Sequence, residues 1–279
     1  MRSTSNPAFR NLPRGTGNYV GFDPQAGTPG YGNYGAQPGY AGPGGPGGPG
    51  GYGVAYQQSG AVERPMTIDD VVTKTAITLG LALVTGIVTI FTHAYWLAAP
   101  AAIVGLVLAL IVIFKRTPSP ALVLSYAAAE GIVLGAITEL FDNIYPGIAF
   151  QAIAGTFGVF VAMLVVYKTG AIRVTPRLTK WVIGATFGVV IVLLANFVVG
   201  MFGVNLGIRD GSPLSIVISV VIIGIAAFNL LLDFDQADRM IRSGMPARWA
   251  WYAAFGLTVT LVWLYLEILR LLSYLQRGN

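Results

Sequence analysis

The stretch WVIGATFGVVIVLLANFVVGMF runs from residue 181 to residue 202 without a charged side chain. An α-helix rises 1.5 Å per residue, so about 20 such residues cross the ~30 Å of hydrocarbon in a bilayer. Strands that span a membrane alternate polar and apolar residues, and this stretch does not. It therefore predicts a transmembrane helix.

Six further apolar runs of similar length lie in the chain from residue 72 onward, and prolines or polar residues separate most of them. Together with the first stretch they give the predicted spans Val72–Thr92, Trp96–Phe114, Leu122–Leu140, Ile148–Tyr167, Trp181–Phe202, Leu214–Leu232 and Ala253–Leu275. The sequence thus predicts an all-α polytopic membrane protein, with a seven-helix bundle in residues 65–279.

The composition agrees with a membrane protein and excludes several classes of site. Apolar residues make up 54% of the chain and charged residues only 10%, against about 25% charged in a typical soluble protein. There is no cysteine and a single histidine, His93, which excludes disulfides, thiolate metal sites and multi-histidine metal sites. No tightly bound cofactor is expected. An enzyme is not expected either, because the Gly-x-Gly-Asp motif of intramembrane aspartyl proteases is missing.

Residues 1–64 differ from the rest of the chain. Residues 1–60 hold 17 of the 36 glycines and 8 of the 16 prolines, and the segment lacks the apolar core of a secretory signal. Such a composition cannot bury enough surface to fold. The segment is predicted to be a disordered tail, either a simple tether or a partner-binding segment with tyrosines as contact points.

Basic residues are distributed unequally between the two sets of connections. The net charge is +5, but these residues lie between the spans, which favours a topological explanation over nucleic-acid binding. On one side of the predicted bundle, the connections contain only Arg209 between spans, with Arg277 at the end of the chain, whereas the connections on the other side are rich in basic residues. The positive-inside rule then predicts a cytoplasmic N-terminus and an external C-terminus. The rich set is Arg64, Lys74, Lys115, Arg116, Lys168, Arg173, Arg177, Lys180, Arg239, Arg242 and Arg248.

Small residues recur every four positions in two spans. Ala127, Gly131 and Gly135 do so in the third span, and Gly184 and Gly188 do so in the fifth. This spacing lets two helices approach closely in a membrane. Both spans are therefore predicted to pack closely through these residues, rather than to line a pore with them.

Ionisable groups within a membrane span are costly, so each is a candidate functional residue. Glu130 lies near the middle of the third span, and its helical neighbours cannot neutralise it. It is either protonated and hydrogen-bonded to another helix or part of a cation path. By contrast, Asp235 and Asp238 each precede an arginine by four residues, which is typical of surface ion pairs.

Two further carboxylates require partners. Asp233 ends the sixth span, has no basic residue one helical turn away, and is expected to find its partner on another helix. Glu267 lies among apolar residues of the seventh span. It either pairs with Arg270 as a possible counter-ion or faces the bundle interior while Arg270 reaches the interface.

Three segments resemble motifs of the Bax inhibitor (transmembrane Bax inhibitor motif) family. They are Glu130–Gly135, Leu232–Gln236 and Leu264–Glu267, and the opening Ser3–Pro7 with the Gly/Pro-rich tail is similar to a bacterial branch of that family. The resemblance implies a bundle with its last helix at the centre, in the inner membrane of a bacterial cell. It also implies a pH-sensitive calcium leak channel, in which Ca²⁺ and protons are the ligands.

By motif position, the pH sensor and gate implied by the resemblance are Asp233 and Glu267. Two adjacent carboxyls in low dielectric share a proton and titrate as a pair, and when ionised they suit transient contacts with Ca²⁺. Better-known members carry Asp at the Glu267 position. On the predicted spans the two residues also differ in depth by about 15 Å, so contact requires a shallow or tilted seventh helix.

A second function is open on the same sequence. Some bacterial relatives are thought to regulate a membrane protease or another membrane complex, and a protruding tail suits such a role. The alternative is therefore a regulatory membrane protein that transports nothing.

Overall fold

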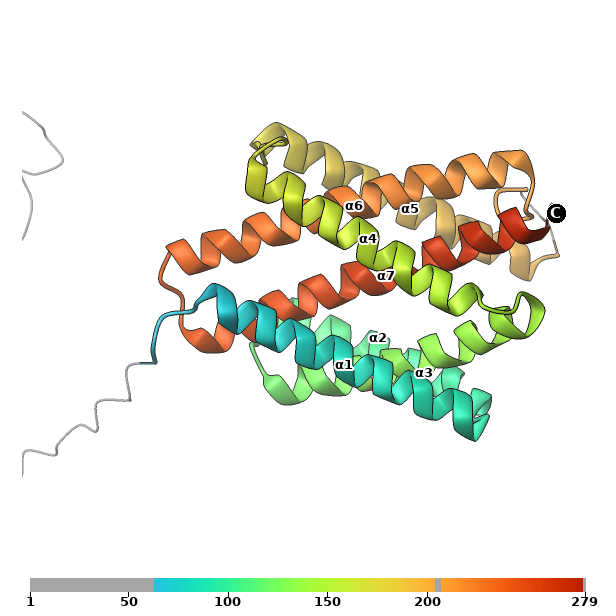
Figure 1. The fold of residues 1–279 in the computed structure, drawn as a ribbon, viewed down its shortest axis with the longest axis horizontal. Helices are drawn as coiled ribbons and strands as arrows, with labels where there is room; N and C mark the ends of the chain where they lie inside the picture. The colour runs from blue at the N-terminus through green and yellow to red at the C-terminus, as the bar shows by residue number, and fades with distance from the viewer. Residues whose placement is uncertain (1–62, 204–206, 278–279) are drawn as a thin grey trace, which may run out of the picture. The chain divides into compact units, whose positions relative to one another are not determined.

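The fold of the described residues, 63–203 and 207–277 of a computed structural model, is all-helical (Figure 1). Seven helices in these ranges are long and apolar enough to cross a membrane, which confirms the predicted fold class. The helices are α1 (Ile68–Thr92), α2 (Ala98–Lys115), α3 (Pro120–Ile144), α4 (Ile148–Thr169), α5 (Pro176–Met201), α6 (Pro213–Arg242) and α7 (Ala250–Arg277), with short 3₁₀ helices η2 (Tyr95–Leu97) and η3 (Ala247–Trp249). The predicted tail lies outside the described residues, except for Glu63 and Arg64.

Proline marks where several helices begin. Pro120, Pro176 and Pro213 are the first residues of α3, α5 and α6, a position where the missing N–H of proline has no intrahelical partner to lose. The largest difference from the prediction is in α6, which continues past Leu232 to Arg242. Its last turns are held by ion pairs four residues apart, from Asp235 to Arg239 and from Asp238 to Arg242.

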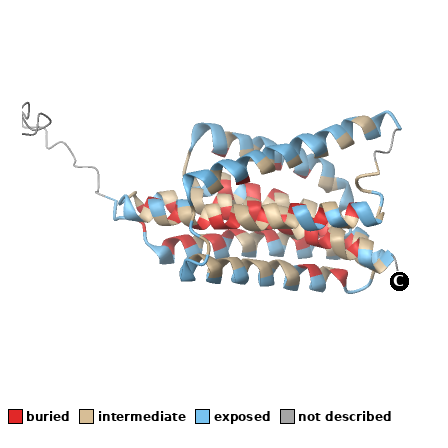
Figure 2. Ribbon diagram, turned by 90° about the horizontal axis from the view of Figure 1, so that it is seen from above, coloured by how far each residue is buried: buried red, intermediate tan, exposed pale blue. Residues whose placement is uncertain are grey.

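The last helix lies at the centre of the bundle, as the resemblance implied. α7 packs against α1, α3, α4 and α6, whereas α5 packs mainly against α6. A larger share of α7 is buried than of any other described span. Figure 1 shows α7 between α1 and α4, and Figure 2 shows buried residues concentrated along the inner helices while other helices are largely exposed.

The glycine prediction is confirmed for the third span and is wrong for the fifth. A Cβ on Gly131 or Gly135 would overlap the backbone of α1, so these glycines allow α1 and α3 to approach closely. At Gly184 and Gly188 an added Cβ would meet nothing within 4 Å. The four-residue spacing is the same in both helices, but only α3 turns its glycines toward a neighbouring helix.

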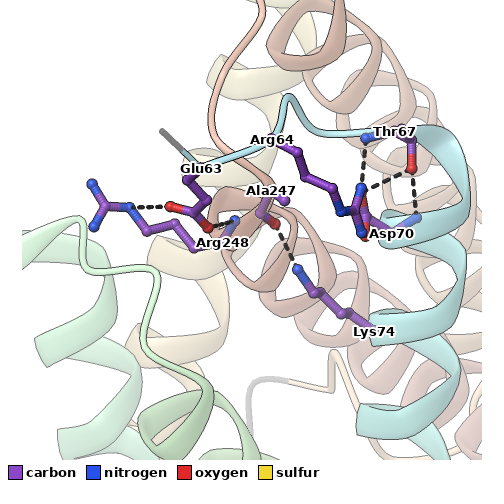
Figure 3. Close-up of polar contacts among 7 residues, drawn as sticks. All are labelled: Glu63, Arg64, Thr67, Asp70, Lys74, Ala247 and Arg248. Carbon is purple, nitrogen blue, oxygen red and sulfur yellow. Dashed lines mark hydrogen bonds and ion pairs between the residues drawn. The ribbon is translucent and has the colours of Figure 1, made fainter. Parts of the chain in front are cut away.

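The chain enters the bundle through a short docked segment. The Glu63 carboxylate accepts a hydrogen bond from the Arg248 N–H at 2.7 Å. The Arg64 carbonyl accepts one from the Ala247 N–H at 2.9 Å. Next to them, Met66 is only 2% exposed. The residues that precede α1 are therefore attached to the turn that starts α7, as Figure 3 shows.

Charged side chains strengthen this attachment. Arg64 donates two hydrogen bonds to the Asp70 carboxylate, at 2.8 and 2.6 Å, and this contact raises the pKa of Arg64. Asp70 also completes a capping box with Thr67 at the start of α1. Lys74 donates to the Ala247 carbonyl at 2.6 Å.

We call the end of the bundle that holds this segment the N-terminal end, and the other the opposite end.

Candidate functional site

Asp233 lies beside a cavity near the N-terminal end. The cavity has a volume of about 250 Å³, and its walls come from α2, α6 and α7. The Thr260 hydroxyl of α7 donates to Asp233 Oδ2 at 2.6 Å, which confirms that Asp233 finds its partner on another helix. Among the described residues no basic group forms an ion pair with this carboxyl. Asp233 is thus a carboxyl held by one hydroxyl at the edge of a cavity.

Glu267 has a different environment, in which it pairs with Arg270 and also faces the interior, while Arg270 does not turn away from it. Its side chain faces the interior and is only 2% exposed. Arg270 also donates to Oε2 at 2.8 Å. A second arginine, Arg209, lies 3.5 Å from the same oxygen, and Ser219 donates to Oε1 at 3.4 Å. A buried carboxylate between two guanidinium groups is well compensated for its lost hydration.

Arg209 is a site residue that the sequence analysis assigned only to topology. It lies just before α6 and reaches the α7 carboxylate from outside both helices. Burial and the charge of Arg270 lower the pKa of Arg209. The signal that could have identified it is its isolation, because it is the one basic residue between spans on the arginine-poor side.

Asp233 and Glu267 do not form one hydrogen-bonded pair in this structure. The Asp233 partner on α7, Thr260, precedes Glu267 by two helical turns, or roughly 10 Å at 1.5 Å per residue. Buried apolar side chains, including Leu230 of α6 and Leu264 of α7, lie in the same core. The implied pairing is therefore replaced by two separate carboxyl sites on α6 and α7, because the helix register sets the residues at different depths.

Glu130 is the third carboxyl that the sequence indicated within the spans. It is half-buried on α3, where it interacts with the Tyr126 hydroxyl of the preceding turn. Tyr126 packs edge-on against Phe255, whose side chain lines the Asp233 cavity. Within residues 63–203 and 207–277, no group of three or more histidine, aspartate or glutamate side chains is placed to hold a metal ion.

A carboxylate at the opposite end escaped the sequence analysis. Glu139 of α3 is 8% exposed, and its Oε1 lies 3.0 Å from His93 Nδ1 and accepts a hydrogen bond from the Tyr95 hydroxyl. These contacts join the α1–α2 connection to α3. The indicator in the sequence was the single histidine directly after a predicted span.

The connection before α6 gives a prediction for acid stability. The Ser212 N–H and the Ser215 hydroxyl donate to Asp210, and these hydrogen bonds lower the pKa of Asp210 to about 2. A folded-state pKa below the unfolded value of about 3.9 means that the stabilisation is complete above about pH 5 and is lost as the pH falls toward 2. We expect the thermal midpoint in detergent to fall less between pH 6 and pH 3 in Asp210→Asn than in the wild type. Equal falls would contradict this assignment.

The comparisons with known proteins agree with this architecture. A search of curated proteins gives no match. A family model described as Bax inhibitor 1 like matches residues 6–277, and so includes all seven helices and both carboxyl sites. The chain is therefore a multi-pass membrane protein that belongs to the Bax inhibitor 1 like family.

Proposed function

We propose that the protein is a pH-responsive cation leak channel with Ca²⁺ as the transported ion. The observation that carries the proposal is Asp233, a carboxyl that borders a cavity between α2, α6 and α7 and has a hydroxyl, not a cation, as its partner. An uncompensated carboxyl in a membrane protein is costly, so its proton occupancy responds to the surroundings. Its ionised oxygens are hard ligands of the kind that Ca²⁺ prefers.

Asp233 acts in this proposal as the proton-sensitive group. When it is ionised, its charge attracts a cation into the cavity. When it is protonated, this attraction is lost and the contact with Thr260 on α7 changes, which biases the position of α7. Glu130, one aromatic layer from the cavity through Tyr126 and Phe255, is a candidate further carboxyl on the cation path.

Glu267 is the second carboxyl of the proposed path. Its two arginines hold it in place and compete with a cation for its oxygens. Leu230, Leu261 and Leu264 are each at most 7% exposed and belong to the core around α7. We infer that this layer closes the path, and that conduction requires α7 to move relative to α6. Ca²⁺ contacts at Asp233 and Glu267 are then transient and successive.

Neutralising the proton-sensitive carboxyl tests the proposal directly. In proteoliposomes, Asp233→Asn is expected to remove most of the pH dependence of Ca²⁺ influx, because asparagine keeps an acceptor for Thr260 but does not titrate. Asp235→Asn is the matched control, since Asp235 is two residues away and forms a surface ion pair with Arg239. Wild-type flux and pH dependence in Asp233→Asn would exclude Asp233 as the sensor.

The orientation is part of the same proposal. The connections α2–α3, α4–α5 and α6–α7 lie at the N-terminal end, and together with the helix ends beside them they hold most of the basic residues, including Lys115, Arg173 and Arg248. We infer from the positive-inside rule that this end faces the cytoplasm of a bacterial cell, with the protein in the inner membrane and the C-terminus outside.

The docked N-terminal segment supports regulation through a partner as the second candidate function. Glu63 and Arg64 connect residues 1–62 to the start of α7 at Ala247 and Arg248. A membrane protease or other membrane protein that binds the tail would therefore act close to the central helix. Deleting residues 1–60 is expected to abolish co-purification of such a partner and leave Ca²⁺ flux intact. Retention of every partner by the truncated protein argues against this role.

A further inference from the structure

A second cavity, of about 370 Å³, opens between α1 and α4 and has α7 at its base. α3 contributes the remaining wall. Figure 1 shows α7 between these two helices. The mouth of the cavity is formed by exposed apolar side chains. The base of the cavity is formed by Leu261 and Val262, which are only 7% and 8% exposed. The cavity therefore leads from the lipid-facing surface to the central helix. The mouth residues are Leu83, Ile87, Ile153 and Phe157.

The lining has no free polar group to offer a ligand. The Thr138 and Tyr265 hydroxyls are hydrogen-bonded to each other at 2.8 Å, and the Thr156 hydroxyl donates to the Ala152 carbonyl at 2.7 Å. The other lining residues are apolar or glycine. A buried water needs two to four polar partners, so water does not fill this space stably. The cavity is too narrow for a helix, which is about 10 Å across. Its apolar lining therefore fits a hydrocarbon chain.

The extent of the cavity matches one leaflet of a bilayer. Along α1 its lining runs from Leu79 to Ile90, which is about 16 Å at 1.5 Å per residue, or half of the ~30 Å hydrocarbon thickness. Ile90 lies near the end of α1, and Ala149 lies at the start of α4. Both are close to the opposite end of the bundle. One end of the cavity is thus near the membrane surface and the other is near the bilayer centre.

We propose that this cavity binds one acyl chain of a phospholipid from the leaflet at the opposite end. The headgroup lies beyond Ile90 and Ala149, and the chain end lies against Leu261 of α7. The mouth is continuous with the lipid-facing surface of α1 and α4, so the chain enters sideways from the bilayer. The assignment does not depend on the proposed transport activity.

Photolabelling of the full-length protein in phospholipid nanodiscs tests the proposal. The probes are phosphatidylglycerols with a diazirine either at the end of one acyl chain or near its headgroup, and adducts are mapped by mass spectrometry. We expect the chain-end probe to label Leu261 or Val262 and the headgroup-proximal probe to label Ile90 or residue 149. Labelling confined to exposed residues outside the cavity, such as Phe150, with both probes would overturn the proposal, and this result needs only the wild-type protein.

A cavity-filling substitution provides the second test. Ala149→Phe places a ring in the cavity, so chain-end labelling of α7 is expected to fall about tenfold, since overlap with a filled space is strongly unfavourable. Val165→Phe is the control on the same helix, because Val165 is 53% exposed and does not line the cavity. Unchanged α7 labelling in Ala149→Phe, or labelling by a diazirine fatty acid but not by the phospholipid, would contradict the assignment.

Discussion

Gly135→Ala is expected to destabilise the protein by about 3 kcal/mol, at the upper end of the usual cost of overpacking. The new methyl group would overlap the Gly86 carbonyl oxygen and lie 2.8 Å from the Gly86 Cα. Both atoms belong to the α1 backbone, so no side-chain rotation can relieve the overlap. The α1–α3 contact must then open. The measurement is reversible unfolding in mixed micelles, with helicity as the signal.

The matched control for this prediction is Gly188→Ala. Gly188 is also a glycine within a membrane-spanning helix, but an added Cβ there meets nothing within 4 Å. Because alanine favours a helix over glycine, we expect this variant to equal the wild type or to exceed it by up to about 1 kcal/mol. Equal losses at the two positions would show that close packing of α1 on α3 is not the cause.

Glu267→Leu is expected to cost about 2–4 kcal/mol, because it leaves two arginines without the carboxylate with which both form ion pairs. Breaking a buried ion pair by removing one partner costs about 3–5 kcal/mol. The Arg209 and Arg270 side chains retain 23% and 27% exposure, so water offsets part of that loss. Glu267→Gln keeps an oxygen acceptor and is expected to lose about half as much. Chemical denaturation in micelles measures both variants.

A double substitution separates charge from packing in this prediction. Glu267→Leu with Arg270→Met removes an unpaired charge along with the carboxylate, so it is expected to be more stable than Glu267→Leu alone. Asp238→Asn is the surface control, since its partner Arg242 is 78% exposed and exposed pairs contribute about 0–1 kcal/mol. A double variant less stable than Glu267→Leu would exclude unpaired arginines as the source of the loss.

For Asp233 and Glu267 the sequence predicted that each carboxylate needs a partner, but not which partners they have. Asp233 was expected to look to another helix, and Thr260 of α7 is its partner. Glu267 pairs with Arg270, as the first alternative had it, and its side chain is buried in the interior as the second had it. The approach of Arg209 could not be predicted, because it depends on how the α5–α6 connection folds over α7. The resemblance likewise placed Asp233 and Glu267 together without fixing their depths.

The sequence by itself determined the seven membrane-spanning helices, although not the residues at which they begin. The reason is local: a backbone in hydrocarbon must satisfy its hydrogen bonds within each span, so a long apolar run is sufficient to specify a helix. Tertiary structure alone decided that Gly135 packs while Gly188 does not, that Glu267 lies between two arginines, and that a cavity reaches α7. These features depend on the rotation and register of each helix against its neighbours, which are set by side-chain packing between segments far apart in the chain.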